Sequence, residues 1–203
     1  QVVRTLVEHG AKMVVVACNT ATVNAIEELR EEFPDTPIVG IEPAIKPAAQ
    51  ASEAIIVLGT NSTVSNPRYH ALIDEYAPAH QIWNIGAPEL VHQVESGNLT
   101  DTTNLSQSLT QPVFEGATAL VIGCTHFSFL VPTIEKNWPH LRIFDGAEGV
   151  VRRAESIASD LDIDDEADST DTFVTTGPPR TVTFTTSPIT LLHIDLADSS
   201  PQE

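Results

Sequence analysis

Only two cysteines, Cys18 and Cys124, occur among the 203 residues of this chain. They form no Cys-x-x-Cys pair, and the seven histidines show no His-x-x-x-His spacing. This scarcity disfavours a bound metal, because a structural zinc site needs four such ligands. Each cysteine is followed by a residue with a hydroxyl or amide side chain, which suits a reactive thiol. We therefore expect free thiols in a reducing cytoplasm rather than a disulfide.

Positive charge is also scarce. The chain has 10 lysine and arginine residues against 28 aspartates and glutamates, which gives a net charge of −18. A surface this acidic argues against nucleic-acid binding and against an anionic membrane surface. We interpret the carboxylates as a source of solubility or as an adaptation to a salt-rich habitat. Only three lysines occur, and none lies in a segment that resembles a pyridoxal-binding site.

Long hydrophobic runs are the third absence. No apolar stretch approaches the ~20 residues of a membrane-spanning helix, so we expect no membrane span. We find no signal-peptide pattern; the sequence opens on Gln1, without an initiator methionine, in an amphipathic helical pattern. This start predicts a fragment or a processed product. A chain of 203 residues can still bury a substantial core, in one large domain or two small ones.

One segment occurs twice in the chain. Residues 7–20 read VEHGAKMVVVACNT and residues 113–126 read VFEGATALVIGCTH, at an offset of 106 residues. Each copy predicts a helix end, a glycine stop, a short apolar strand and a cysteine where the strand ends. The match continues at an offset of 105 residues, from 33–34 and 38–39 to 138–139 and 143–144. A whole strand–helix–strand unit is therefore duplicated, and each copy carries one thiol.

The rest of the pattern alternates strands and helices. We predict strands at 13–17, 38–41, 54–58 and 81–85, and helices at 1–10, 19–32, 44–53 and 147–160, with further helices around Tyr69 and from Pro88 to Val94. Residues 97–112 look like an exposed polar loop with one helix around Leu105. Residues 160–171 form an acidic run, which we interpret as a linker, and residues 173–194 look extended. The rhythm indicates an α/β fold with mostly parallel sheets covered on both faces.

The cysteines could be inert, since a free cysteine is often buried. Against this, each follows a strand and precedes a polar residue that opens a helix, where the helix N-terminus lowers a thiol pKa. Two such units could place thiols on opposite faces of one small ligand, which is what stereoinversion requires: one group removes an α-proton and the other delivers one to the opposite face. Helix N–H groups and the hydroxyls of Thr20 and Thr125 would hold carboxylates.

The cysteine segments also resemble a known family. VACNTAT at 16–22 and IGCTHF at 122–127 are similar to the two signature cysteine segments of bacterial glutamate racemases, in the aspartate/glutamate racemase superfamily. Supporting matches are VGIEP at 39–43, LGTNSTV at 58–64 and VESG at 94–97. The resemblance covers roughly residues 3–160. It implies cofactor-independent conversion of L-glutamate to D-glutamate for peptidoglycan, and it leaves a homodimer open.

By this resemblance Cys18 and Cys124 are the paired acid and base, and His126 assists its thiol. The positions that match substrate contacts of the family are Asn19, Thr20, Thr60, Thr63, Thr125 and Glu95, with Glu89 as the fallback for Glu95. Plainer interpretations stay open for three of these features: a hydrogen-bonded core histidine at 126, turn or cap threonines at 60 and 63, and a solvated carboxylate at 95.

The resemblance further implies two pseudo-twofold-related subdomains with the site in the cleft between them. We assign residues 1–43 with 147–203 to the first and 44–146 to the second. The family's opening strand, with an Asp-Ser pair thought to assist the first cysteine, would lie upstream of Gln1, so residues 1–203 alone are expected to be poorly active and marginally folded. The alternatives are a racemase for aspartate or another amino acid, and an inactive, truncated binding protein.

Overall fold

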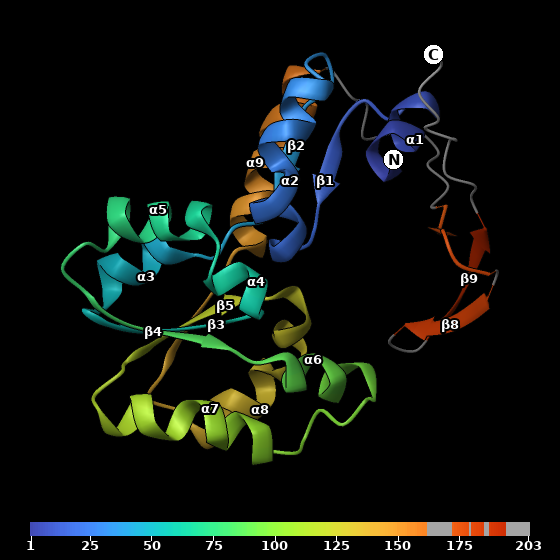
Figure 1. Ribbon diagram of the computed structural model, residues 1–203. Coiled ribbons are helices and arrows are strands. Elements are labelled where there is room, and N and C mark those ends of the chain that lie inside the picture. Colours follow the sequence, from blue (N-terminus) through green and yellow to red (C-terminus); the bar gives the residue numbers. More distant parts are fainter. Residues whose placement is uncertain (162–171, 179, 185–186, 194–203) are drawn as a thin grey trace.

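The computed structural model of the protein describes residues 1–161, 172–178, 180–184 and 187–193 (Figure 1). Its helices are α1 (Val2–Glu8), α2 (Asn19–Glu32), α3 (Ile45–Ala51), α4 (Asn61–Val64), α5 (Pro67–Tyr76), α6 (Pro88–Glu95), α7 (Thr103–Phe114), the 3-10 helix η1 (Thr125–Leu130), α8 (Val131–Asn137) and α9 (Ala147–Asp160). Its strands are β1 (Val14–Val16), β2 (Ile38–Gly40), β3 (Ala54–Gly59), β4 (Gln81–Gly86), β5 (Ala119–Gly123), β6 (Arg142–Asp145), β7 (Val174–Thr175), β8 (Arg180–Phe184) and β9 (Ser187–His193).

The first sheet consists of the parallel strands β1 and β2, joined by α2. Val14 and Ile38 of the strands pack with Val3 of α1 and Ile26 of α2 in a small apolar core. The turn from α1 into β1 uses Gly10 at φ +89°, a left-handed conformation that a residue with a side chain rarely adopts. The predicted helix at 19–32 and the strands around Val15 and Val39 are confirmed.

The second sheet has four parallel strands in the order β4-β3-β5-β6. Its central strands β3 and β5 read as nearly continuous apolar runs because both faces of the sheet are covered. Alternate residues point to opposite faces: Ile56 and Leu120 pack toward α6, α7, η1 and α8, whereas Val57 and Val121 pack toward α3 and α5. Figure 1 shows these two helix layers on either side of the sheet.

The duplicated units have the same strand pairing. In the first copy Val14, Val15 and Val16 pair with Ile38, Val39 and Gly40. In the second copy Leu120, Val121 and Ile122 pair with Ile143, Phe144 and Asp145, which are the residues that the sequence repeat makes equivalent. The mixed α/β architecture with parallel sheets is therefore as predicted, and the two copies agree down to the register of their strands.

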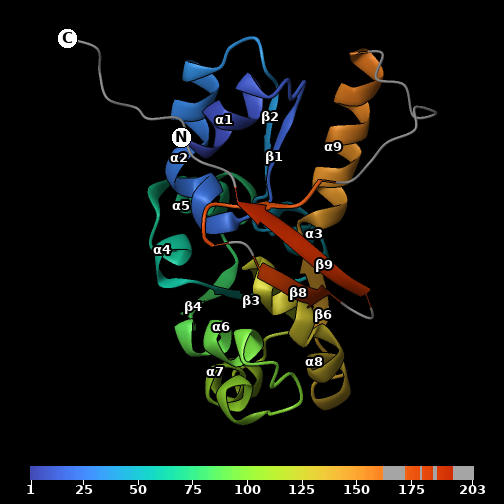
Figure 2. The same cartoon turned by 90° about the vertical axis from the view of Figure 1, so that its right-hand side faces the viewer.

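Two connections carry the chain between the sheets. The first runs from β2 to α3 and the second from β6 to α9, and they touch, because a Cβ on Gly146 would lie 2.4 Å from the carbonyl oxygen of Glu42. Both views place α1, α2, β1 and β2 at one end of the molecule and α6, α7 and α8 at the other (Figure 1 and Figure 2). The predicted boundaries after residue 43 and before residue 147 lie at these connections, and the division into subdomains stays a prediction.

Residues 97–112 contain the helix expected around Leu105, but this helix is partly buried rather than part of an exposed loop. Helix α7 begins at Thr103 and buries Leu105 and Leu109 completely. The preceding turn is held by Gln93 of α6, whose amide donates to the carbonyls of Asn98 and Asp101 at 3.0 and 2.8 Å. Most polar residues of α7 lie on its other faces, although Ser108 is buried with the leucines, so the predicted helix is amphipathic.

The remaining predictions concern the C-terminal part. The predicted helix at 147–160 is confirmed as α9. The acidic run lies almost wholly outside the described residues. Beyond it, the described residues form β7, β8 and β9, in agreement with the expected extended structure; β9 pairs parallel to β7 and antiparallel to β8. Among the described residues, no helix is long and apolar enough to cross a membrane.

Candidate active site

The two cysteines occupy equivalent places in the fold. Cys18 follows β1 and precedes α2, with backbone angles φ −144° and ψ 117°. Cys124 follows β5 and precedes η1, with φ −147° and ψ 127°. The matching angles turn each chain from a strand into a helix at the residue that carries the thiol. Both thiols therefore lie at the carboxyl ends of parallel strands, where α/β sheets bind ligands.

The surroundings of the two thiols differ. Cys18 is exposed, whereas only 6% of Cys124 is accessible. Burial raises the pKa of the Cys124 thiol; the backbone N–H groups of His126 and Phe127 lower it, and the nearby charge of Cys18 raises it. The net shift is upward, so the lowering expected from the helix N-terminus is reversed for Cys124, because a buried thiolate loses its solvation.

Cys124 begins a chain of three polar side chains. Its Sγ lies 3.9 Å from Nδ1 of His126, and Nε2 of His126 lies 2.7 Å from a carboxylate oxygen of Glu95. When Nε2 carries the proton and donates it to Glu95, Nδ1 is free to accept the proton of the thiol. Glu95 is the last residue of α6, while the fallback Glu89 lies in its first turn. The arrangement thus links Glu95 to the buried thiol through His126.

Three threonine hydroxyls meet between the first cysteine segment and the loop after β3. Thr20 Oγ1 lies 2.8 Å from Thr60 Oγ1 and 3.2 Å from Thr63 Oγ1, and the last two lie 3.0 Å apart. Thr60 also caps α4 by accepting the backbone N–H of Thr63. The capping interpretation therefore describes Thr60 correctly, and the same hydroxyl joins a triangle that reaches the Cys18 helix. Thr63 is fully buried, while Thr20 and Thr60 are half-buried.

Asn19 and Thr125 directly follow the two cysteines. The side chain of Thr125 makes a hydrogen bond, whereas that of Asn19 makes none. Thr125 donates to the carbonyl oxygen of Ala17 at 3.4 Å and so joins the second cysteine segment to the first. Asn19 is 1% exposed, and neither its side-chain nitrogen nor its oxygen has a hydrogen-bond partner. Buried polar groups are normally paired, so this amide has unused capacity for a polar ligand group.

The site contains groups that can accept and donate protons. One thiol is exposed, and the other is buried beside an imidazole–carboxylate pair and two backbone N–H groups. The described residues include no group of three or more His, Cys, Asp and Glu side chains placed to hold a metal ion. Acid–base chemistry on a small anionic substrate is what this set of groups can perform.

The fold and these cysteine segments match known proteins. A family model described as Asp/Glu/Hydantoin racemase matches residues 1–154. The chain belongs to this family. Glutamate racemase of Stutzerimonas stutzeri is 35% identical over 180 residues, which are 86% of this chain and 68% of that protein. Glutamate racemase of Pseudomonas aeruginosa is 39% identical over 160 residues, which are 76% of this chain and 60% of that protein.

A solved structure of a racemase agrees. The crystal structure of Escherichia coli glutamate racemase, in complex with L-glutamate and the activator UDP-MurNAc-Ala, superimposes with a TM-score of 0.66 and 31% sequence identity. The match covers 84% of this chain and 66% of that chain. This chain thus spans 60 to 68% of the length of the two curated racemases above.

Some residues around the thiols had no signal in the sequence. Gln93, whose amide fixes the turn after the helix of Glu95, looks like any polar helix residue. Asn24 of α2 donates to Ser62 across the gap between the two sheets. Its place one helical turn after Thr20 could have indicated a shared face, but only the fold shows what that face meets.

Proposed function

We propose that this protein interconverts L- and D-glutamate without a cofactor, by means of Cys18 and Cys124. The observation that supports the proposal most strongly is the pair of thiols at matched strand ends in a chain of the racemase family. The relatives named glutamate racemase, at 35% and 39% identity, favour glutamate as the substrate. The product would be D-glutamate for peptidoglycan, made in the cytoplasm.

The reaction needs one base and one acid on opposite faces of the α-carbon. The thiolate of one cysteine takes the α-hydrogen as a proton, and the electron pair of the broken C–H bond stays on the substrate as a carbanion. The thiol of the other cysteine then gives its proton to the opposite face and is left as a thiolate. Charge and protons balance, and the reverse reaction exchanges the roles of the two sulfurs.

His126 and Glu95 would serve the Cys124 side of the reaction. Burial raises the pKa of this thiol, so at neutral pH it is poised as the acid and needs help to act as the base. Nδ1 of His126 accepts its proton, and the carboxylate of Glu95 stabilises the imidazolium that results. His126 and Glu95 would thus let the Cys124 thiol lose its proton when it has to act as the base.

Substrate binding would use the polar groups between the sheets. The unpaired amide of Asn19 and the hydroxyls of Thr20, Thr60 and Thr125 are suited to carboxylate and ammonium groups of an amino acid. Thr63 would act mainly by holding Thr60, since it is fully buried. We propose that the two subdomains, residues 1–43 with 147–203 and residues 44–146, close on the substrate from opposite sides.

The test is racemisation by the protein as its gene encodes it. Circular dichroism should follow the decay of either glutamate enantiomer in chelator without pyridoxal phosphate, with solvent deuterium incorporated at the α-carbon. Cys18→Ser and Cys124→Ser should each lower kcat by at least about 100-fold, because a serine hydroxyl is a far weaker base than a thiolate.

Three results would contradict the proposal. A serine variant with near-normal turnover would remove that cysteine from the mechanism. A clear preference for aspartate or a hydantoin over glutamate would move the protein to another branch of its family, whose description includes those substrates. Absence of racemisation with every amino acid, with ligand binding retained, would favour a binding protein.

A further inference from the structure

Helix α2 presents a stripe of polar side chains to α4 and α5. Thr20, Asn24 and Glu27 follow one another at four- and three-residue spacing, which places them on one face of the helix. Beyond the threonine triangle, Asn24 donates to the hydroxyl of Ser62 at 3.0 Å and accepts from the amide of Asn66 at 3.3 Å. This face of the Cys18 helix is therefore attached to the segment that follows β3.

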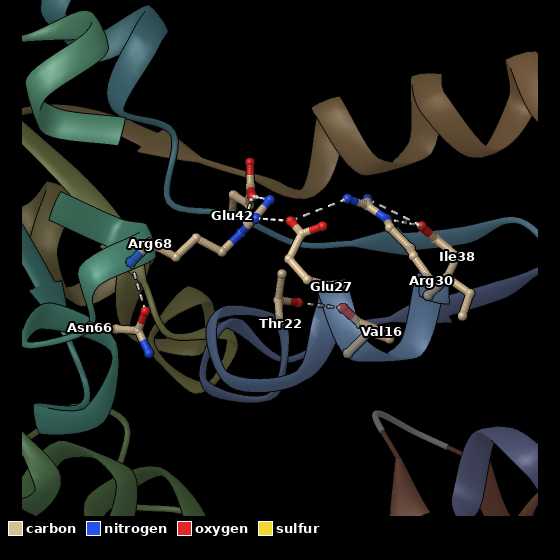
Figure 3. Close-up of polar contacts among 8 residues, drawn as sticks. All are labelled: Val16, Thr22, Glu27, Arg30, Ile38, Glu42, Asn66 and Arg68. Carbon is tan, nitrogen blue, oxygen red and sulfur yellow. Dashed lines mark hydrogen bonds and ion pairs between the residues drawn. The ribbon is translucent and has the colours of Figure 1, made fainter. Parts of the chain in front are cut away.

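At the far end of the stripe, Arg68 of α5 binds two carboxylates (Figure 3). Its Nε and Nη2 donate to one carboxylate oxygen of Glu42 at 3.0 and 2.5 Å, and its Nη1 pairs with Glu27. The side chain of Asn66 accepts the backbone N–H of Arg68 at 2.9 Å and fixes the helix turn that carries the guanidinium. The Arg68 and Glu42 side chains are 29% and 33% exposed, so water shields this pair only in part.

Glu42 lies in a connection between the two sheets. Glu42 follows β2 in the first connection, and its carbonyl oxygen lies against Gly146 of the second connection. Arg68 therefore holds α2 and the point where both connections cross, from a helix that packs on the four-stranded sheet. Movement of one sheet relative to the other would have to break or stretch these contacts.

Charge makes Arg68 difficult to replace. Burial alone lowers the pKa of its guanidinium, but hydrogen bonds and charges from Glu42 and Glu27 outweigh burial and raise the pKa. The chain has only 10 lysine and arginine residues and a net charge of −18. Without the guanidinium, Glu27 and Glu42 would be left as two carboxylates that no longer share a cation, and they would repel each other.

We propose that Arg68 is a positioning residue that clamps the two sheets together and so holds the Cys18 end of α2 against the Thr60 loop and Cys124. The proposal rests on the proposed racemase function, because two-sided proton transfer requires both thiols at a fixed separation. Arg68 itself is assigned no contact with substrate. Its effect passes through α2. Arg68 binds Glu27 directly, and Glu27 lies on the same face of α2 as Thr20, which contacts Thr60.

The test compares Arg68→Met with Arg30→Met in the protein as its gene encodes it. Arg30 is a matched control, because it lies 3.9 Å from the same Glu27 but donates to the carbonyl of Ile38 within the first sheet's own unit (Figure 3). We expect Arg68→Met to lower kcat/KM for glutamate about tenfold, mainly through kcat, and Arg68→Lys to restore part of the loss. Arg30→Met should stay within about twofold of wild type.

A second measurement tests the clamp without measuring catalytic activity. Alkylation by iodoacetamide followed by peptide mass spectrometry reports Cys18 and Cys124 separately, because each lies in its own peptide. Loosening the clamp should raise the alkylation rate of the buried Cys124 about fivefold in Arg68→Met and leave it unchanged in Arg30→Met. Glu42→Gln combined with Arg68→Met should add little beyond Arg68→Met alone, because the two changes break one interaction.

The outcomes separate the clamp from the catalytic proposal. Wild-type protein without racemase activity would refute the proposed function, while alkylation would still test Arg68. Equal Cys124 alkylation and equal kcat/KM in Arg68→Met and wild type would overturn the clamp. A melting temperature by circular dichroism that falls far more in Arg68→Met than in Arg30→Met, with kcat unchanged at low temperature, would make Arg68 a stabilising residue only and would also overturn it.

Discussion

At the scale of single residues, the two thiols differ although they end equivalent strands. The sequence continues with Asn19-Thr20 after the first cysteine and with Thr125-His126 after the second. His126 therefore occupies the place that Thr20 has in the first copy, and it brings an imidazole to the buried thiol. The two strand ends are equivalent in the repeat, yet Cys18 is exposed and Cys124 is buried.

The raised pKa of the Cys124 thiol predicts a pH dependence. A raised pKa means less thiolate at a given pH, so kcat for the enantiomer deprotonated by Cys124 should rise with pH, and the rise should continue above the ordinary thiol pKa of about 8.5. Glu95→Gln should shift this rise to higher pH and lower the rate near pH 7 by about tenfold, because His126 loses the carboxylate that stabilises its charged form. The measurement is the pH profile of initial rates for each enantiomer separately.

Glu89→Gln is the matched control for this profile, since it removes a carboxylate from the first turn of the same helix. It should leave the profile where wild type has it. An identical shift in both variants, or none in Glu95→Gln, would show that Glu95 is only a solvated helix carboxylate.

At the scale of elements, helix α7 shows that a mostly polar segment can still cover a sheet with a few buried leucines. Its sequence, TNLSQSLTQPVF, is mostly polar, yet Leu105 and Leu109 are fully buried one turn apart. They pack in the core beneath the four-stranded sheet together with Leu120 of β5. A helix expected in an exposed polar stretch thus covers the sheet on the side that supports η1 and Cys124.

Leu105→Ala should lower the free energy of unfolding by about 2–5 kcal/mol, because it leaves a cavity in a closely packed core. The matched control is Leu161→Ala, whose leucine is 40% exposed after α9 and should cost less than about 1 kcal/mol. Urea denaturation followed by circular dichroism measures both. Equal losses in the two variants would contradict the placement of α7 against the sheet.

At the scale of the whole molecule, the dominant feature is the excess of negative charge. A net charge of −18 on 203 residues produces repulsion that the folded state must tolerate. Arginine side chains relieve it locally, as in the pairs of Arg4 with Glu32 and of Arg152 with Glu148. Carboxylates without such a partner are screened by counterions from the solvent.

Added salt should therefore stabilise the protein. Raising KCl from 0.1 to 1 M shortens the screening length from about 10 to about 3 Å, and we expect the melting temperature to rise by about 5 °C. The control is sucrose at matched osmolality, which changes solvation without screening charge. A melting temperature that stays constant or falls with KCl would show that the carboxylates lie too far apart to repel measurably.

The sequence by itself determined the local architecture. Apolar runs bounded by glycine and proline predicted β1, α2, β2, β3 and β5, and the duplicated segment predicted that Cys18 and Cys124 end equivalent strands. These features depend on residues near one another in the chain, so their periodicity and spacing are visible without a fold. The family resemblance then directed attention to His126, Glu95 and the threonines.

Tertiary structure decided what those residues meet. Glu95 contacts His126, Thr20 contacts Thr63, and Arg68 contacts both Glu27 and Glu42. The residues in these pairs are 26 to 43 positions apart in the sequence. Burial likewise set the pKa of Cys124 against the expectation from its helix end. Such effects arise from the packing of separate elements, and local sequence carries no record of which distant side chains will face each other.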